Sequence, residues 1–291
     1  MQYLLETTVN GVTLGAIYAL IALGFVVVSK ATSILNFAHG SFLVLGSYLA
    51  VTLLSTLGLP FLLAIVLIPL VMGGLGIAIH YSVMRWMVGK AFFAVVLTTV
   101  GMEIIIHAAL LMGYGPSDRG RLTGLPDGRI RLGPLEITIV NAIIIGTAAL
   151  TVLGFLWFFK RTRTGLHMRA MADNLEAAAA QGISPNWMYA LAWCTGLGMA
   201  GIGGVLYAHY TPSIHLDLTA VGLRAFPAAV LGGLDSVGGA VVGGLVLGLI
   251  ETIGSAYFGA EYRDVLAFGT MFVMLLLRPT GFFGSKELVR V

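Results

Sequence analysis

From Ala31 to Met84 the sequence contains no Asp, Glu, Lys or Arg. This segment is far longer than the about 20 apolar residues that a helix needs to cross a bilayer. Only 10% of the whole chain is charged, against about 25% in soluble domains, and 58% is hydrophobic. We therefore expect a polytopic membrane protein, which excludes a soluble enzyme, a disordered chain and a nucleic-acid-binding protein.

Breaks in the apolar sequence divide it into about eight spans. Gly58-Leu59-Pro60 interrupts the long uncharged segment, because proline is tolerated at the start of a helix and disfavoured inside it. The last three candidates are short or interrupted by glycine. The predicted fold class is an all-α membrane bundle, a single domain over residues 1–291 with discontinuous or re-entrant helices. The six clear spans are expected at 7–29, 37–57, 60–82, 91–113, 137–159 and 188–210, and the rougher candidates are 214–234, 238–258 and 264–278.

Basic residues predict the orientation of the bundle. Loop 160–187 contains the densest basic cluster, and positive charge gathers on the cytoplasmic side of membranes, so we expect this loop inside. The N-terminus is then outside, and the C-terminal tail with Lys286 and Arg290 is cytoplasmic. The segment 114–136 is expected to be an ordered external loop, although it contains Arg119, Arg121, Arg129 and Arg131.

The cytoplasmic loop contains a predicted short helix over 173–181. Asp173 followed by Glu176 fits a capping box, and the alanines from Ala177 onward are strong helix formers. Gly182 is a typical residue at which a helix ends. Two interpretations stay open at this point: a small interfacial helix in a basic loop, or a docking helix for a cytoplasmic partner.

Glycines predict both packing and a break. Gly244 and Gly248 lie four residues apart, so they share a helix face on which another helix can approach closely. Asp235 lies in a short segment, 234–237, with a glycine pair on each side. We expect this segment to break the helix at membrane depth, which is tolerated only where the backbone is buried in protein or lines water.

Polar residues within the spans are candidates for a substrate pathway, because an ionised group at mid-bilayer costs about 2.5–3.5 kcal/mol on insertion scales. Two starts of spans are polar and poorly helical, and they are expected on opposite sides of the membrane. Inverted repeats with discontinuous helices place substrate contacts in this way. A purely structural role is an equal alternative for the two glutamates. The candidates are Asn36, His39, Glu103, Asp217, Arg224, Asp235 and Glu251, and no metal site or catalytic set is expected among them.

Five passages together resemble a known family. The segment Glu176-Ala177-Ala178-x-x-x-Gly182 is similar to the E-A-A-x-x-x-G element of bacterial ABC importer permeases. Residues 10–24, Leu35-Asn-Phe-Ala-His-Gly40, residues 228–239 and Arg278-Pro-Thr-Gly281 resemble the branched-chain amino acid permeases of the high-affinity Liv system, H-type. The resemblance covers nearly the whole chain. Leu35 and Asp235 depart from the family pattern, and permeases for urea and short amides share much of it.

The resemblance implies a non-catalytic membrane subunit that binds no cofactor itself. In such importers ATP and Mg bind to two cytoplasmic ATP-binding subunits, and the chain accordingly contains no Gly-x-x-x-x-Gly-Lys-Ser/Thr segment. It also implies a second permease subunit, a homologue rather than a copy, and a periplasmic or lipid-anchored substrate-binding protein, in a bacterial plasma membrane. The residues that would couple to the ATPase are Arg169, Asp173, Glu176, Ala177, Ala178 and Gly182. An ion-coupled carrier or channel is the main alternative, and a membrane-embedded lipid enzyme has least support.

Overall fold

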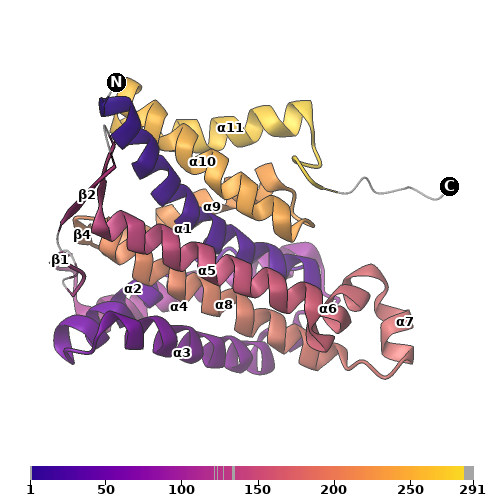
Figure 1. Ribbon diagram of the computed structural model, residues 1–291. Coiled ribbons are helices and arrows are strands. Elements are labelled where there is room, and N and C mark those ends of the chain that lie inside the picture. The colour runs from indigo at the N-terminus through magenta and orange to yellow at the C-terminus, as the bar shows by residue number, and fades with distance from the viewer. Residues whose placement is uncertain (1, 121, 123, 127, 133–134, 285–291) are drawn as a thin grey trace.

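The computed structural model describes residues 2–120, 122, 124–126, 128–132 and 135–284. Figure 1 shows a helical bundle with short strands at one end and α6 and α7 at the other, which we call the hairpin end and the α7 end. The principal helices are α1 (Gln2–Thr32), α2 (His39–Ala50), α3 (Phe61–Ser82), α4 (Phe92–Tyr114), α5 (Ile139–Arg161), α6 (Arg163–Asp173), α7 (Leu175–Ala180), α8 (Pro185–Tyr210), α9 (Thr219–Gly232), α10 (Val237–Phe258) and α11 (Arg263–Leu277). The strands are β1 (Arg119–Gly120), β2 (Arg129–Leu132), β3 (Leu135–Thr138) and β4 (Ser213–Ile214), and short turns are η1 (Val51–Thr56), η2 (Met84–Trp86), η3 (Leu216–Leu218) and η4 (Ala260–Tyr262).

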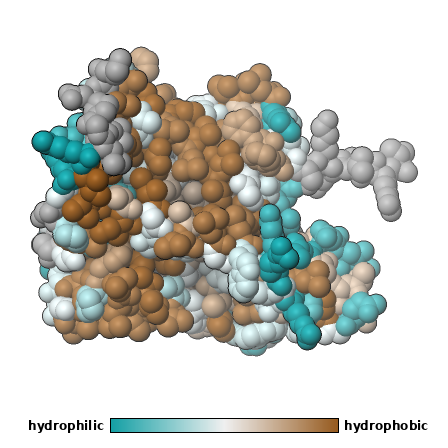
Figure 2. Space-filling view, viewed as in Figure 1, coloured by the Kyte–Doolittle hydropathy of each residue, from teal (hydrophilic) through white to brown (hydrophobic). Residues whose placement is uncertain are grey.

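The α-helical membrane fold predicted from the sequence is confirmed. Within the described residues, seven helices are long and apolar enough to cross a membrane: α1, α2 together with η1, α3, α4, α5, α8 and α10. The helices α9 and α11 are shorter, with 14 and 15 residues. Figure 2 shows hydrophobic side chains over the helices and hydrophilic ones gathered at α6 and α7 and beside the strands. This pattern suits a bundle surrounded by lipid, with polar groups at its two ends.

Helix α1 forms the centre of the bundle. It packs on α5, α8, α9 and α10, and its middle is buried on all sides. The predicted glycine face on α10 makes this possible, because a Cβ atom added to Gly244 would lie 2.3 Å from the backbone of Ala19. Gly248 approaches Gly15 in the same way. The predicted role of these glycines in helix packing is therefore confirmed.

The turn between α9 and α10 lies at the α7 end, and the expectation of a break at membrane depth is wrong. The α9 helix ends at Gly232, and Ser236 caps α10 by accepting a hydrogen bond from the backbone N–H of Gly239 at 3.0 Å. Since α10 spans 22 residues from this point, the turn joins two helices at the end of the bundle. The side chain of Lys30 donates to the backbone carbonyl of Asp235 at 2.9 Å, so α1 extends beyond the predicted end of its span to bind this turn.

The hairpin end is closed by two pairs of strands. β1 pairs with β4, and β2 pairs with β3, in antiparallel register. Glu136 accepts from Arg129 at 3.0 Å and from Arg131 at 2.8 Å, and the hydrogen bond from Arg129 holds the pKa of its carboxyl below the ordinary value. The order predicted for 114–136 is present in these strands, while Arg121 lies outside the described residues.

Candidate functional site

Two half-helices meet in the middle of the bundle. The chain leaves α1 at the α7 end, turns back over residues 33–38, and begins α2, which runs to the hairpin end. It returns from β4 at the hairpin end through η3 and begins α9, which runs to the α7 end. Their first turns touch, because a Cβ atom on Gly222 would lie 2.1 Å from the Cα of Gly40. The predicted arrangement of two interrupted helices approached from opposite sides is present.

A cavity of about 290 Å³ lies beside this contact. It is mostly apolar, and its only polar side chains among the described lining residues are those of Asn36 and His39. The structure therefore brings these two predicted pathway residues together. The cavity is lined by Phe25, Asn36, Phe37, His39, Gly40, Gly222, Leu223, Phe226 and Phe268.

Asn36 and His39 are almost completely buried, and they retain unused hydrogen-bonding capacity. Asn36 is 1% exposed, and neither its amide nitrogen nor its amide oxygen has a partner among the described residues. His39 Nε2 lies 3.1 Å from the carbonyl oxygen of Ile21, while Nδ1 has no described partner. A carbonyl can only accept, so Nε2 carries the proton and Nδ1 is the acceptor in the neutral ring. Two buried acceptors and one buried amide donor are thus available at the cavity.

A second polar cluster lies between α1, α9, α10 and α11. The hydroxyl of Tyr18 donates to Glu251 at 2.7 Å, and Arg224 lies 3.7 Å from the other oxygen of that carboxylate. Arg224 also donates to Asp264 at 2.6 Å. Because Glu251 is buried with both an opposite charge and a hydrogen-bond donor, its burial at membrane depth is compensated. The cluster attaches α9 to three neighbouring helices.

The sequence placed Arg224 and Glu251 on the candidate pathway, but it could not pair them with their partners. Tyr18 and Glu251 are 233 residues apart, and tyrosine is common in membrane helices. Asp264 lies in the first turn of α11, and in the sequence it resembles any acidic residue at the start of a helix. The sequence contains one weak signal for these contacts. A single arginine and a single glutamate lie in two otherwise apolar segments, which predicts that each pairs with an opposite charge.

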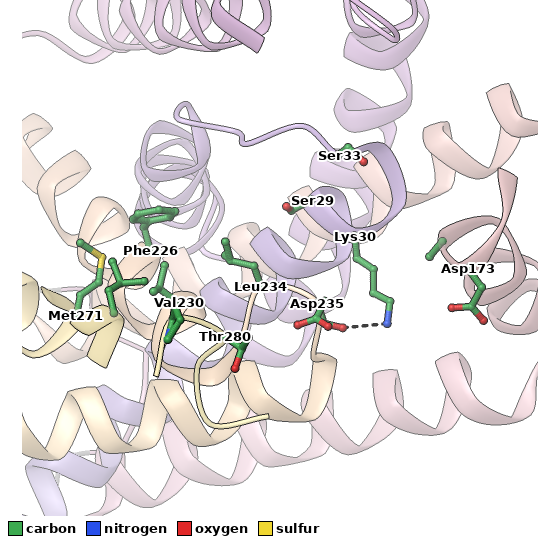
Figure 3. A pocket seen from close by; sticks show the side chains of 13 residues that line it. Ser29, Lys30, Ser33, Asp173, Phe226, Val230, Leu234, Asp235, Met271 and Thr280 are labelled. Atoms are coloured by element: carbon green, nitrogen blue, oxygen red, sulfur yellow. Dashed lines mark hydrogen bonds between the residues drawn. The ribbon is translucent and has the colours of Figure 1, made fainter. Parts of the chain in front are cut away.

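The α7 end contains a larger open cavity of about 840 Å³ (Figure 3). Lys30 and Asp235 line it together with Asp173, the last residue of α6. Figure 3 shows the Lys30 side chain extended toward Asp235, with Asp173 facing the cavity from the side of α6. The apolar part of the lining comes from α9 and α11, including Phe226 and Met271. Phe226 also lines the central cavity, so the two cavities share this ring in their linings.

The predicted short helix in the 160–187 loop is present, but its bounds and its cap differ from the prediction. Asn174, and not Asp173, caps α7, because the side-chain amide oxygen of Asn174 accepts from the N–H of Ala177 at 2.9 Å. Asp173 ends a preceding helix, α6, which the sequence did not predict. The Asn174 amide oxygen is as good a cap as a carboxylate, so the capping-box pattern pointed one residue too early. Gly182 adopts φ +85° directly after α7, as predicted for a helix-ending glycine.

The proposed coupling residues occupy two different environments. Glu176 and Ala177 are exposed on α7, whereas Ala178 is buried. The guanidinium of Arg169 donates to the backbone carbonyl of Phe159 and lies over its ring. Arg169 therefore holds α6 against the end of α5, and α7 is the part of the loop that is free to contact a partner.

Glu103 joins neither the central cavity nor the Arg224 cluster, and only the backbone of Asp217 is described. Glu103 is half-buried on α4, a peripheral helix that packs mainly on α2, and the adjacent Ile104 is 64% exposed. Asp217 lies in the η3 turn that leads into α9. Asp217 thus lies a few residues before Gly222, which forms the central contact with Gly40. Glu103 lies on the outer surface of the bundle.

Comparison with known proteins agrees with this architecture. Residues 7–275 match the family model described as branched-chain amino acid transport system / permease component. The chain belongs to this family. It is 33% identical to the high-affinity branched-chain amino acid transport system permease protein BraD of Pseudomonas aeruginosa, over 100% of this chain and 99% of that protein. It is also 33% identical to the permease protein LivH of Escherichia coli, over 99% and 98% of the two chains.

Membership of the family identifies the chain as a multi-pass membrane subunit of a transport system, in agreement with its seven long apolar helices. A more distant relative is the autoinducer 2 import system permease protein LsrC of Salmonella paratyphi B, which is 30% identical over 50% of this chain and 40% of its own length. The family likeness predicted from the sequence motifs is therefore confirmed, including its H-type.

Proposed function

We propose that the chain is the membrane-spanning subunit of an ATP-driven importer that moves branched-chain or related small amino acids inward by alternating access. The observation that carries this proposal is α7, a short capped helix exposed beyond the bundle in a family of transport permeases. A six-residue helix with Ala178 as its only buried residue contributes little to the bundle. Its shape and exposure suit insertion into a groove on another protein.

The α7 end is assigned to the cytoplasm. Lys30, Arg85, Lys160 and Arg161 all lie where helices reach this end, and basic residues are enriched on the cytoplasmic side. The N-terminus of α1 is then outside, and Arg278 is inside. The tail residues Lys286 and Arg290, which were predicted to be cytoplasmic, lie outside the described residues.

In the complete transporter this chain would contact four kinds of partner. Two cytoplasmic ATP-binding subunits would hold ATP and Mg and receive α7. A homologous second permease subunit would complete the membrane core, and a heterodimer is favoured by the H-type resemblance. A periplasmic or lipid-anchored binding protein would deliver substrate at the hairpin end, and lipid of the bacterial plasma membrane would surround the bundle.

The test is to uncouple ATP hydrolysis from transport at α7. The chain would be co-expressed with the products of neighbouring genes, reconstituted in liposomes, and assayed for leucine uptake and ATP hydrolysis. Gly182→Val forces a branched residue into φ +85°, and Glu176→Lys reverses the charge on the exposed face of α7. Both variants should assemble, hydrolyse ATP and lose uptake at least tenfold.

The control is Lys90→Glu, a charge reversal on an exposed residue at the same end of the bundle but outside α6 and α7. It should transport as the wild type does. Normal uptake in both α7 variants would contradict the docking role. Uptake driven by an ion gradient without ATP would instead favour a secondary carrier, and competition by urea or short amides would revise the substrate class.

A further inference from the structure

The central cavity has features of a ligand site that its structural role does not explain. A buried amide without a hydrogen bond is unfavourable, because its polar atoms have lost water and gained nothing in exchange. Among the described residues, both polar atoms of the Asn36 amide and the Nδ1 atom of His39 lack a hydrogen-bond partner. Both side chains line the cavity, which has room for a small molecule. A ligand that donates and accepts hydrogen bonds would satisfy them.

Two helix N-termini converge on the same space. Neither α2 nor α9 has a side-chain cap on its first turn, since Ala38 and Leu218 occupy the cap positions. The N–H of His39 donates to the backbone carbonyl of Asn36 at 3.2 Å, and the helix dipoles place partial positive charge at the starts of α2 and α9. Gly40 and Gly222 line the cavity at this contact and present backbone without side chains. Such a position favours a carboxylate.

The rest of the lining is apolar and aromatic. Phe25 and Phe226 pack edge to face with centroids 5.4 Å apart, and Phe268 and Leu223 lie opposite in the lining. The volume of about 290 Å³ is at the lower limit of ordinary ligand pockets, about 300–1,000 Å³. The cavity thus combines a polar end of fixed geometry with a small apolar compartment.

We propose that this cavity is a subsite within the permease for an α-amino acid with a small apolar side chain. The carboxylate accepts from the Asn36 amide nitrogen and lies at the positive ends of the α2 and α9 helix dipoles. The ammonium donates to the Asn36 amide oxygen and to His39 Nδ1. The side chain occupies the compartment formed by Phe25, Phe226 and Phe268. This subsite rests on the proposed function, because it requires that amino acids pass through the bundle.

The experiment uses the complete transporter in liposomes with its binding protein and a panel of labelled amino acids. Asn36→Leu removes the donor and the acceptor at similar volume, and Phe268→Trp fills the compartment. Both should lower leucine uptake at least tenfold while assembly and ATP hydrolysis persist. The control is Phe272→Trp, the same substitution one turn further along α11 on an exposed residue, which should leave uptake unchanged.

A third variant separates a binding role from a merely structural one. Phe268→Ala enlarges the compartment and should raise the ratio of phenylalanine to valine uptake by about tenfold, the scale on which apolar pockets discriminate size. Wild-type uptake in Asn36→Leu, or an unchanged ratio in Phe268→Ala, would overturn the subsite. If the wild-type transporter itself shows no ATP-dependent uptake, the proposed function fails first. If the wild type couples ATP hydrolysis to uptake and the cavity variants transport normally, the subsite is refuted and the proposed function stands.

Discussion

Replacing Asn36 by leucine should stabilise the permease while impairing transport. Both polar atoms of Asn36 are buried without partners among the described residues, in a side chain that is 1% exposed. An amide in this state costs about 1–3 kcal/mol on the scale of protein mutational data. Leucine has a similar volume and no polar group to leave unpaired. We therefore expect Asn36→Leu to raise the free energy of unfolding by up to about 1–3 kcal/mol.

The assay is thermal unfolding of the purified transporter in detergent, followed by intrinsic tryptophan fluorescence at a fixed scan rate. A gain of 1 kcal/mol corresponds to about 2–4 °C for domains of 150–250 residues, so Asn36→Leu should raise the Tm by several degrees. Saturating leucine should raise the Tm of the wild type and leave that of the variant unchanged, because a ligand stabilises the state that binds it.

The matched control is Asn141→Leu. Asn141 is also buried, but its amide donates to the side-chain oxygen of Asn10 at 2.8 Å. Leucine there leaves Asn10 without its partner, and the Tm should fall. If Asn36→Leu lowers the Tm as much as Asn141→Leu does, the Asn36 amide is satisfied in the resting protein. The reasoning that assigns it to a ligand would then be refuted.

Three further results are expected. Glu251→Leu should lower the Tm more than Asp264→Leu, because breaking a buried charge pair costs about 3–5 kcal/mol, and exposed pairs are worth about 0–1 kcal/mol; the reverse order would contradict the structural role of the cluster. Gly222→Ala should destabilise by about 1–3 kcal/mol through overpacking, while Gly238→Ala, where the added Cβ meets nothing within 4 Å, should be close to neutral in the same melting assay. The lowered pKa of Glu136 means that its ion pairs stabilise the β2–β3 hairpin above the ordinary glutamate pKa and are lost as the pH falls through the folded-state pKa. Hairpin amides, measured by hydrogen exchange corrected for intrinsic rates, should therefore lose protection at acid pH in the wild type and show no such step in Glu136→Gln.

Much of the fold follows from the distribution of charge along the chain. Uncharged segments long enough to cross a bilayer locate α3, α5 and α8, α4 is apolar apart from Glu103, and Pro60 directly precedes α3. These features are local, since every backbone group in lipid must be satisfied within its own helix. The ends of helices were less predictable. In the sequence, Lys30 marks the cytoplasmic end of the first span. In the structure α1 continues to Thr32, and the long side chain of Lys30 carries its amine to the turn at Asp235.

The candidate sites depend on contacts between distant segments, which periodicity and composition do not encode. Asn36 and His39 were identified from their place at a polar helix start. Their apolar neighbours Phe226 and Phe268 look from sequence like lipid-facing or packing residues, and only the fold brings them to the same cavity. Glu103 was identified as a carboxylate at mid-span, and the structure places it on α4, a helix at the periphery of this chain.

Helix α9 connects the central cavity, the Arg224 cluster and the open cavity at the α7 end. In the proposed alternating-access mechanism, these connections constrain how α9 can move. Its first turn contacts α2 at the central cavity, its middle is tied through Arg224 to Glu251 and Asp264, and its last turn accepts backbone hydrogen bonds from Phe282 and Phe283. The turn that follows is held by Lys30 and lines the cavity that Asp173 borders beside α7. Because α6 packs on α1, and α1 packs on α9 and holds the turn after it through Lys30, a displacement of α6 and α7 reaches α9 through α1. Because the Arg224 cluster anchors the middle of α9, such a displacement rotates the helix about that anchor, and a rotation moves Phe226, the ring shared by both cavities. A rigid translation of α9 would instead break a 2.6 Å charge-assisted hydrogen bond and a buried ion pair, which makes rotation the less costly motion.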